Sequence, residues 1–214
     1  MRCGLCQISE IKVRMTLNCL IYNWERNNYN KPSLNETVYW IIYFYSLEDK
    51  FTQTRLERPY NSIHSFGSSY GEHKRYLEFS DEDYKNLIAF AKEIGIPLTA
   101  SSMDPVSFDI LVDDLNVPFV KIGSGDANNP LLLEKVAKRT NINAVISTGM
   151  SDIEDVQRIY DLFSRYRSQK NFVILQCTSS YPTLLESVNL NVISRYCLSY
   201  LTNCCIKLLQ LFSL

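Results

Sequence analysis

The chain has 214 residues and a formal net charge of −1, from 22 basic and 23 acidic residues. Hydrophobic residues make up 46% of it and charged residues 21%, which is ordinary for a globular protein with a core of its own. The balanced charge and the lack of a polybasic stripe exclude an electrostatic case for nucleic-acid binding. Among the seven cysteines only Cys3 and Cys6 have CxxC spacing, and no second pair or histidine accompanies them, so no zinc site is predicted.

Neither end of the chain predicts a membrane segment. No secretory hydrophobic region follows the N-terminus. The apolar stretch 198–214 is interrupted by Asn203 and Lys207 and is shorter than the ~20 residues of a spanning helix. We therefore expect a cytoplasmic protein with reduced thiols and no membrane partner.

Helices and strands are predicted to alternate from about residue 80. Ser80 is a good N-cap for the first helix, and three acidic residues follow it at the positive end of the helix dipole. Gly95 and Pro97 end this helix. Its predicted buried face consists of Tyr84, Leu87, Ile88, Ala91 and Ile94. Before it, the short charge cluster 72–75 is interpreted as a solvated face.

The same cycle repeats three times. Helices are predicted over 105–115, 130–139 and 153–166, opened by Asp104-Pro105, by Asn129-Pro130 and by a capping box of Ser151 and Glu154. Apolar strands are predicted over 96–100, 117–123, 143–148 and 171–178. Continuous apolar strands between helices indicate parallel βαβ units. No GxGxxG motif follows a strand, and polar residues lie at successive strand ends, so a (β/α)8 barrel is favoured over a doubly wound sheet.

The most informative strand end is "VPFVKIGSGDANNP", Val117 to Pro130. A lysine at the end of an apolar strand needs an anion, which makes Lys121 a candidate binding residue. Gly123 and Gly125 would let the backbone approach such a ligand closely. For the nearby hydroxyl side chains, the alternative is that they bind no ligand and are present because serine and threonine are common in turns.

Five motifs in fixed order carry a family resemblance. They are "LERPYNSIHSFGSSYGEHKRYLEFS", "LTASSMD", "NVPFVKIGSGDANN", "VISTGM" and "LQCTSSYP". With them the chain resembles the sialic acid synthase (N-acetylneuraminate synthase) family, and residues 56–80 are most similar to its animal branch. The resemblance implies a (β/α)8 TIM barrel, present here as a partial barrel. It predicts three segments: a non-matching N-terminal segment 1–45, a partial synthase domain 46–196 and a non-matching tail 197–214.

The resemblance also implies a reaction and a site. The family condenses phosphoenolpyruvate with N-acetylmannosamine or its 6-phosphate, giving N-acetylneuraminate or its 9-phosphate and phosphate. It implies a homodimer and a divalent metal, Mn²⁺ or Mg²⁺. Ser179 and Tyr181 fall where the family contacts the sugar, and no catalytic residue is assigned. The substrate-binding residues carried over to this chain are Lys121, Ser124, Ser102, Ser147, Ser179 and Tyr181.

Several family features have no match in this chain. The family's "EIGxNHxG" motif, its "KFQ" lysine, and the "GYSxH" and "ERH" segments with the metal-binding histidines are not found. The two histidines present, His64 and His73, do not match those ligands. We therefore expect a chain incomplete at both ends, a truncated or mis-spliced product or an imperfect gene model, in which turnover is impaired.

Two further functions stay open from the sequence. One is a non-catalytic fragment or pseudoenzyme of this family. The other is another phosphate-handling TIM barrel, such as an aldolase or a keto-deoxy sugar acid synthase. A Schiff-base aldolase would need Lys121 as its nucleophile.

Overall fold

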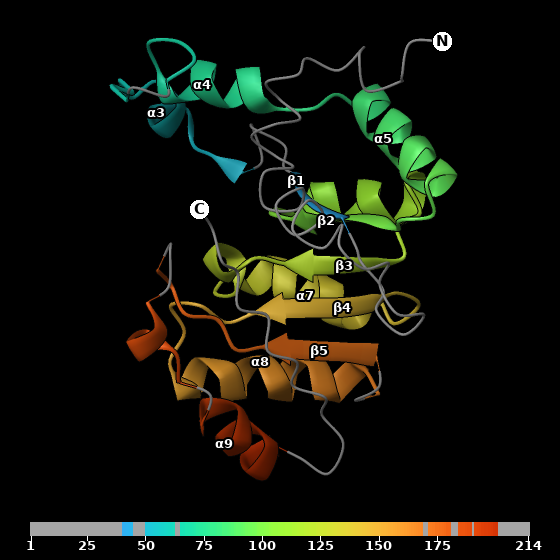
Figure 1. Cartoon of the computed structure of the whole chain (residues 1–214), viewed down its shortest axis with the longest axis vertical. Helices are drawn as coiled ribbons and strands as arrows, with labels where there is room; N and C mark the ends of the chain where they lie inside the picture. Colours follow the sequence, from blue (N-terminus) through green and yellow to red (C-terminus); the bar gives the residue numbers. More distant parts are fainter. Residues whose placement is uncertain are drawn as a thin grey trace. The chain divides into compact units, whose positions relative to one another are not determined.

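A computed structural model describes residues 40–44, 50–62, 65–168, 171–180, 184–189 and 191–200 (Figure 1). The chain divides into two compact units, Met1–Asn116 and Val117–Leu214, and each is described by itself. Within the described residues no helix is both long and apolar enough to cross a membrane. The domain boundaries after residues 45 and 196 stay a prediction.

Unit 1 contains two parallel strands, β1 (Trp40–Phe44) and β2 (Leu98–Ser102). They pair in register from Trp40 opposite Leu98 to Phe44 opposite Ser102. Every residue of β2 is buried, as expected for a strand of a parallel sheet. The sequence predicted β2 within two residues, whereas β1 lies where no strand was predicted.

The helices of unit 1 are α3 (Gln53–Leu56), α4 (Tyr70–Leu77), α5 (Asp81–Glu93) and α6 (Pro105–Asp109), which continues as the π-helix η2 (Ile110–Asp114). α5 begins as predicted, with the Ser80 hydroxyl accepting a hydrogen bond from the Asp83 amide. Its predicted apolar face is too long by one turn. Ile94 is the C-cap residue and is 43% exposed, whereas Leu87 is buried.

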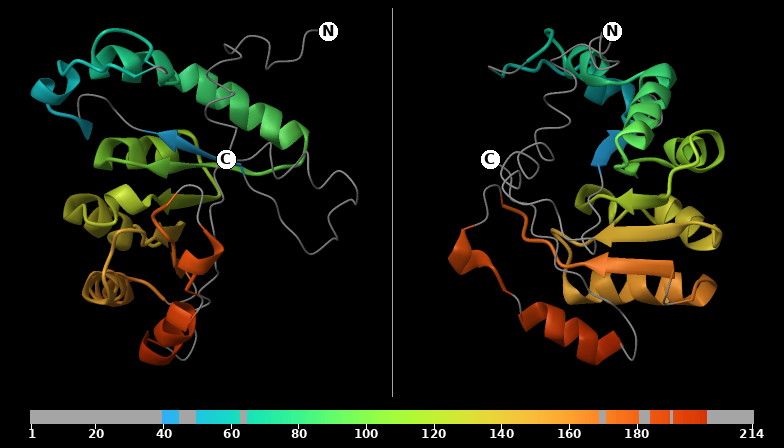
Figure 2. Two further views of the ribbon diagram at one scale, coloured as in Figure 1. Left: turned by 60° about the vertical axis from the view of Figure 1, so that its left-hand side comes forward. Right: turned by 45° about the vertical axis from the view of Figure 1, so that its right-hand side comes forward.

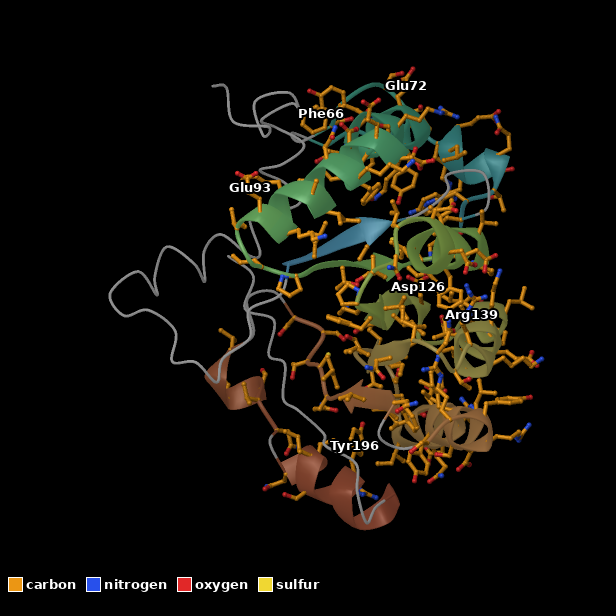
Figure 3. The ribbon with its side chains drawn as sticks, turned by 90° about the vertical axis from the view of Figure 1, so that its right-hand side faces the viewer. Phe66, Glu72, Glu93, Asp126, Arg139 and Tyr196 are labelled. Atoms are coloured by element: carbon orange, nitrogen blue, oxygen red, sulfur yellow. The ribbon has the colours of Figure 1, made fainter. Side chains whose placement is uncertain are left out.

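His73, on α4, is the exception within residues 72–75, where Glu72 and Arg75 are exposed, as a solvated face predicts. Its side chain is only 7% exposed, and its Nδ1 accepts a hydrogen bond from the Phe66 amide at 3.2 Å. The rings of Tyr60 and Phe66 pack against the imidazole. Burial, and then the Lys74 charge, lower the pKa of His73, which favours the neutral ring. Figure 3 shows Phe66 and Glu72 at the same end of the unit. His73 therefore belongs to a half-buried aromatic cluster with Tyr60 and Phe66.

Unit 2 is built on three parallel strands, β3 (Phe119–Ile122), β4 (Asn143–Ser147) and β5 (Phe172–Leu175). β4 pairs with both neighbours, so the order is β3-β4-β5. Two helices, α7 (Pro130–Lys138) and α8 (Ile153–Tyr166), lie on the same side of this sheet (Figure 2). Further elements follow β3 and β5: η3 (Ser124–Asp126), η5 (Leu185–Ser187) and α9 (Asn191–Tyr200).

The two faces of this sheet differ in what they carry. The face under α7 and α8 holds side chains that are each at most 2% exposed: Val120, Ile122, Ala144, Ile146, Phe172 and Ile174. Residues alternate between faces along a strand, so Lys121 lies on the other face. The pairing of Lys121 with Val145 places Ser147, two residues further along β4, on that same face. Among the described residues the face opposite α7 and α8, here called the helix-free face, therefore carries Lys121 and Ser147 beside the apolar Val145, Val173 and Leu175.

Side-chain caps determine the residues at which α7 and α8 begin. The Asn129 side chain accepts a hydrogen bond from the Leu132 amide at 3.2 Å, as the Asn-Pro pair predicted. For α8 the predicted capping box was wrong by one residue. Asp152 and Asp155 cap each other's backbone amides at 2.8 and 3.2 Å, in place of Ser151 and Glu154. A carboxylate is the stronger acceptor at the positive end of a helix.

Arg167 holds together the amino-terminal edge of the sheet in unit 2. Burial lowers the pKa of its guanidinium to about 10, so the group stays charged at neutral pH. It donates to the carbonyls of Ala137 at 3.1 Å and Asn171 at 3.2 Å. It also donates to the carbonyls of Val136, Arg139 and Ile142. These acceptors belong to the end of α7 and to the residues just before β4 and β5, so Arg167 ties together the amino-terminal edge of the sheet.

Candidate anion-binding site

Lys121 is a buried lysine to which the described residues offer no counter-ion. Its side chain is 5% exposed, and among the described residues Nζ has no hydrogen-bond or ion-pair partner. Burial lowers the pKa of Lys121, and an interaction with Cys177 opposes that shift only in part. A buried ammonium group without a partner destabilises the fold unless an anion binds to it. The geometry thus supports the sequence prediction that this lysine serves a ligand.

Ser147, on the neighbouring strand β4, is a second buried polar residue without a partner among the described residues. It is the last residue of β4, it is 1% exposed, and no described residue forms a hydrogen bond with its Oγ. A buried hydroxyl without a partner is uncommon and calls for an explanation. Ser147 shares the helix-free face with Lys121, so one bound anion could satisfy both groups.

Three loops converge at Gly149, just beyond the carboxyl edge of this sheet. The Gly149 amide donates a hydrogen bond to Ser124 Oγ at 3.0 Å, which joins the loop after β4 to the loop after β3. A Cβ at position 149 would lie 2.8 Å from the Oγ atoms of both Ser124 and Ser179. A methyl group at this position would displace one or both of these hydroxyls, and glycine leaves room for them. Ser124 and Ser179 are therefore brought together as the sequence predicted.

Thr148 and Cys177 flank these groups with their hydrogen-bonding capacity already directed to the backbone. Thr148 Oγ1 donates to the Leu175 carbonyl at 2.9 Å and holds the loop after β4 against β5. Cys177, a free thiol that is partly exposed, contacts the same carbonyl at 3.6 Å. Thr148 and Cys177 thus approach the same carbonyl, which joins the loop after β4 to the segment that follows β5.

Ser102 belongs to unit 1, where it ends β2. Its Oγ donates to the Asp104 carbonyl at 3.0 Å. Asp104 in turn caps α6, accepting from the Ser107 amide at 2.7 Å and the Ser107 hydroxyl at 2.6 Å. Lys50 reaches the same turn and donates to the Met103 carbonyl at 3.0 Å. Burial lowers the pKa of Lys50, and the charge of Asp104 acts in the opposite direction.

Not every predicted site residue can be placed, and two contributors were missed. Tyr181 lies outside the described residues. Gly149 and Cys177 were not predicted as site residues, although both fall inside the quoted motifs. The signal for Gly149 was its position right after a strand end with two hydroxyl residues, Ser147 and Thr148. The signal for Cys177 was its spacing of two from Leu175, which keeps both on one face if the chain stays extended.

A metal centre does not fit the described residues. They contain no group of three or more His, Cys, Asp and Glu side chains that could hold an ion. His73 uses Nδ1 as a hydrogen-bond acceptor inside the aromatic cluster, and His64 lies outside the described residues. We therefore derive no chemical step through a metal.

Comparisons with known proteins identify the family. The family model described as "NeuB family" matches residues 43–204, more than half of the chain. The chain belongs to the NeuB family. The mouse protein named N-acetylneuraminate-9-phosphate synthase is 51% identical over 150 residues, which cover 70% of this chain and 41% of that protein. A Drosophila melanogaster protein of the same name is 47% identical over 148 residues, covering 69% and 39%. The chain thus spans about two-fifths of the length of these relatives.

Solved structures confirm the fold class. An N-acetylneuraminic acid synthetase from Leptospira borgpetersenii, in complex with citrate, superposes with a TM-score of 0.58 and 23% identity, covering 67% of this chain and 50% of that one. A spore coat polysaccharide biosynthesis protein from Bacillus subtilis gives a TM-score of 0.53 and 25% identity, covering 70% and 40%. The NeuB chain is therefore part of a TIM barrel. In that fold the helices cover the outside, so the face with Lys121 and Ser147 corresponds to the inner wall.

Proposed function

We propose that this chain binds phosphoenolpyruvate through Lys121, Ser124 and Ser147, and that it carries the substrate cradle of a sialic acid synthase. The observation that carries the proposal is the nearly complete burial of Lys121 without a counter-ion. A carboxylate or phosphate oxygen beside Nζ would supply the missing charge, and Ser147 Oγ could donate to the same anion. The amide–hydroxyl contact between Gly149 and Ser124 would hold that corner of the cradle rigid.

The condensation itself would join phosphoenolpyruvate to N-acetylmannosamine or its 6-phosphate. The enol carbon forms a bond to the aldehyde carbon, water attacks the enol-derived centre, and phosphate leaves. Lys121 would neutralise the anion while charge redistributes, which is the kind of fixed electrostatic support that lowers such barriers most. The relatives' name, a 9-phosphate synthase, favours the 6-phosphate as sugar substrate. Ser179 and Tyr181 are the proposed sugar contacts, in a cytoplasmic homodimer.

Binding and turnover need separate tests. Isothermal titration of the 214-residue protein with phosphoenolpyruvate is expected to show saturable binding. Lys121→Gln, which keeps a polar side chain without the charge, should weaken that binding by roughly 100-fold, the effect of losing one charged contact of about 3 kcal/mol. Lys138→Gln is the matched control, because Lys138 is exposed on α7, where it pairs with Glu134 and lies over the Tyr166 ring. Equal binding by both variants would refute the cradle.

Turnover is measured as phosphate released from phosphoenolpyruvate. The assay contains the protein, Mn²⁺, and either N-acetylmannosamine or its 6-phosphate. Phosphate release that requires the sugar, and is lost in Lys121→Gln, supports the synthase. Release that does not depend on the sugar contradicts it.

A non-catalytic role is the second candidate. It is favoured by the metal misfit, because the described residues include no set of ligands for the ion that the family uses. In that case the chain would bind phosphoenolpyruvate through Lys121 and release no phosphate with either sugar.

Schiff-base chemistry is the third candidate, favoured by the lowered pKa of Lys121. A neutral amine could attack a keto acid such as pyruvate. Borohydride in the presence of pyruvate would then trap a covalent adduct on Lys121. Absence of that adduct, together with sugar-dependent phosphate release, would leave the synthase as the function.

A further inference from the structure

Thr148 fixes the loop after β4 to the neighbouring strand β5 by two hydrogen bonds. Its amide and its Oγ1 both donate to the Leu175 carbonyl, at 3.1 and 2.9 Å. Leu175 ends β5 and pairs with Ser147, so these bonds extend the pairing of the two strands one residue beyond the end of β4. The Thr148 side chain is 2% exposed. A residue held to one acceptor by both its backbone and its side chain has little freedom to move.

The turn that follows β4 begins at the same residue. The Ser151 amide donates to the Thr148 carbonyl at 3.3 Å, which closes a turn over residues 148–151. Inside this turn Met150 has a φ of 64°, a value that is uncommon for a residue with a side chain. Such a conformation persists only where the surrounding structure holds it. The attachment of Thr148 to β5 supplies part of that support, because the turn starts from it.

Both chain neighbours of Thr148 belong to the candidate anion-binding site. Ser147, before it, has a buried Oγ that forms no hydrogen bond with a described residue. Gly149, after it, donates its amide to Ser124 Oγ at 3.0 Å. A shift or rotation of the backbone at Thr148 would therefore move the Ser147 hydroxyl and the Gly149 amide together.

We propose that Thr148 is a positioning residue of the anion-binding site, and that its hydroxyl acts through Ser147 and Gly149. Its one hydroxyl proton is already donated to the Leu175 carbonyl. Donors that are fixed before an anion arrives need no reorganisation when it binds, which is why a tie to a neighbouring strand strengthens binding. The inference rests on the proposed function, because that function assigns Ser147 and Ser124 to the anion.

Thr148→Val and Thr148→Ser form the matched pair that tests the hydroxyl. Valine keeps the branched shape without the hydroxyl, whereas serine keeps the hydroxyl. In calorimetry of the full chain, we expect phosphoenolpyruvate to bind Thr148→Val roughly tenfold more weakly than the wild-type protein, and Thr148→Ser within about threefold of it. Wild-type affinity in Thr148→Val overturns the proposal, and so does a Thr148→Ser variant that binds as weakly as Thr148→Val.

Folding is controlled in the same experiment. The Leu175 carbonyl keeps the Thr148 amide as a donor, so we expect the thermal midpoint of Thr148→Val to fall by only about 2–4 °C. Thr140→Val is the control for the exchange itself, because Thr140 is exposed and lies just before β4, at the amino-terminal edge of the sheet. It should bind phosphoenolpyruvate like the wild-type protein. A loss in this control equal to that in Thr148→Val would overturn the assignment to the carboxyl edge.

A double-mutant cycle with Ser147→Ala separates positioning from a general structural role. If Thr148 acts through its neighbour, its hydroxyl should matter less once the Ser147 hydroxyl is removed. In the Ser147→Ala background we therefore expect Thr148→Val to weaken phosphoenolpyruvate binding by no more than about threefold. An undiminished loss in that background would show that the two residues are independent, and it would overturn the proposal.

Inorganic phosphate distinguishes a failure of this inference from a failure of the proposed function. If the wild-type protein binds phosphate but not phosphoenolpyruvate, and Thr148→Val binds phosphate more weakly, the positioning role is supported and the proposed function is contradicted. Equal binding of phosphoenolpyruvate by the wild-type protein and Thr148→Val contradicts the positioning role alone. A wild-type protein that binds neither anion overturns both.

Discussion

Unit 2 buries two cations, one at each edge of its sheet, and the protein surrounds them in opposite ways. At the amino-terminal edge, Arg167 has five carbonyl acceptors. At the carboxyl edge, Lys121 is 5% exposed and has no partner among the described residues. In TIM barrels the amino-terminal face serves stability and the carboxyl face serves function. A buried charge with hydrogen-bond partners, such as Arg167, therefore indicates a structural role. A buried charge without partners, such as Lys121, indicates a binding site. Substitutions at the two positions test this distinction.

Arg167→Met should cause the largest change. It removes the guanidinium donor from the carbonyls of Ala137 and Ile142, each at a cost of about 1–3 kcal/mol. We expect the free energy of unfolding to fall by roughly 3–5 kcal/mol, measured by urea denaturation. The matched control is Arg165→Met, two residues earlier on α8 and exposed. A loss of similar size in the control would show that the carbonyl network is not the cause.

Lys121→Met should act in the opposite direction on stability. Replacing a buried charge by an apolar side chain of similar length removes its desolvation cost, so we expect a gain on the order of 1–4 kcal/mol in phosphate-free buffer. Binding of phosphoenolpyruvate should be lost in the same variant. Thermal unfolding with and without the ligand measures both effects. A variant less stable than the wild-type protein would mean that Lys121 is satisfied in the folded state.

The stability difference between Lys121→Met and the wild-type protein should depend on pH. Because burial lowers the pKa of Lys121, the folded state releases this proton at a lower pH than the unfolded state does. The stability penalty of Lys121 is thus complete below its folded-state pKa and fades as the pH rises from there toward 10.5, the ordinary lysine value. The advantage of Lys121→Met should therefore shrink along that range. An advantage independent of pH would point to packing as its cause.

Local sequence rules predicted much of this fold, because the signals at helix starts and strand ends are short-range. The extent of α8 was predicted correctly even though its cap was misplaced by one residue, since its apolar periodicity does not depend on the cap. Lys121 was predictable because a lysine within an apolar strand conflicts with its surroundings. The role of Arg167 was not predictable. Its five acceptors are between 4 and 31 residues away in the sequence, and only the fold brings them together.

The sequence placed the candidate site residues at the ends of strands, but it did not show which of their side chains contact one another. β1 was missed because residues 40–44 carry no turn or cap signal and fall in the part without family motifs. His73 was misjudged because three charged neighbours concealed a residue that faces an aromatic cluster. The contact between Gly149 and Ser124 depends on how β3 and β4 pair, which spacing alone does not give.

Gly149→Ala should produce the smallest of the three stability changes while still disturbing the site. The new methyl group would lie 2.8 Å from Ser124 Oγ and from Ser179 Oγ, and 3.1 Å from Ser124 Cβ, so both serines must move. We expect a loss of about 1–3 kcal/mol in unfolding free energy, typical of overpacking, and a weaker affinity for phosphoenolpyruvate in calorimetry. Gly125→Ala is the control, because a Cβ there meets nothing within 4 Å. If Gly149→Ala bound the ligand as well as Gly125→Ala does, the convergence of the three loops would have no part in binding, and the carboxyl-edge site would reduce to Lys121 and Ser147.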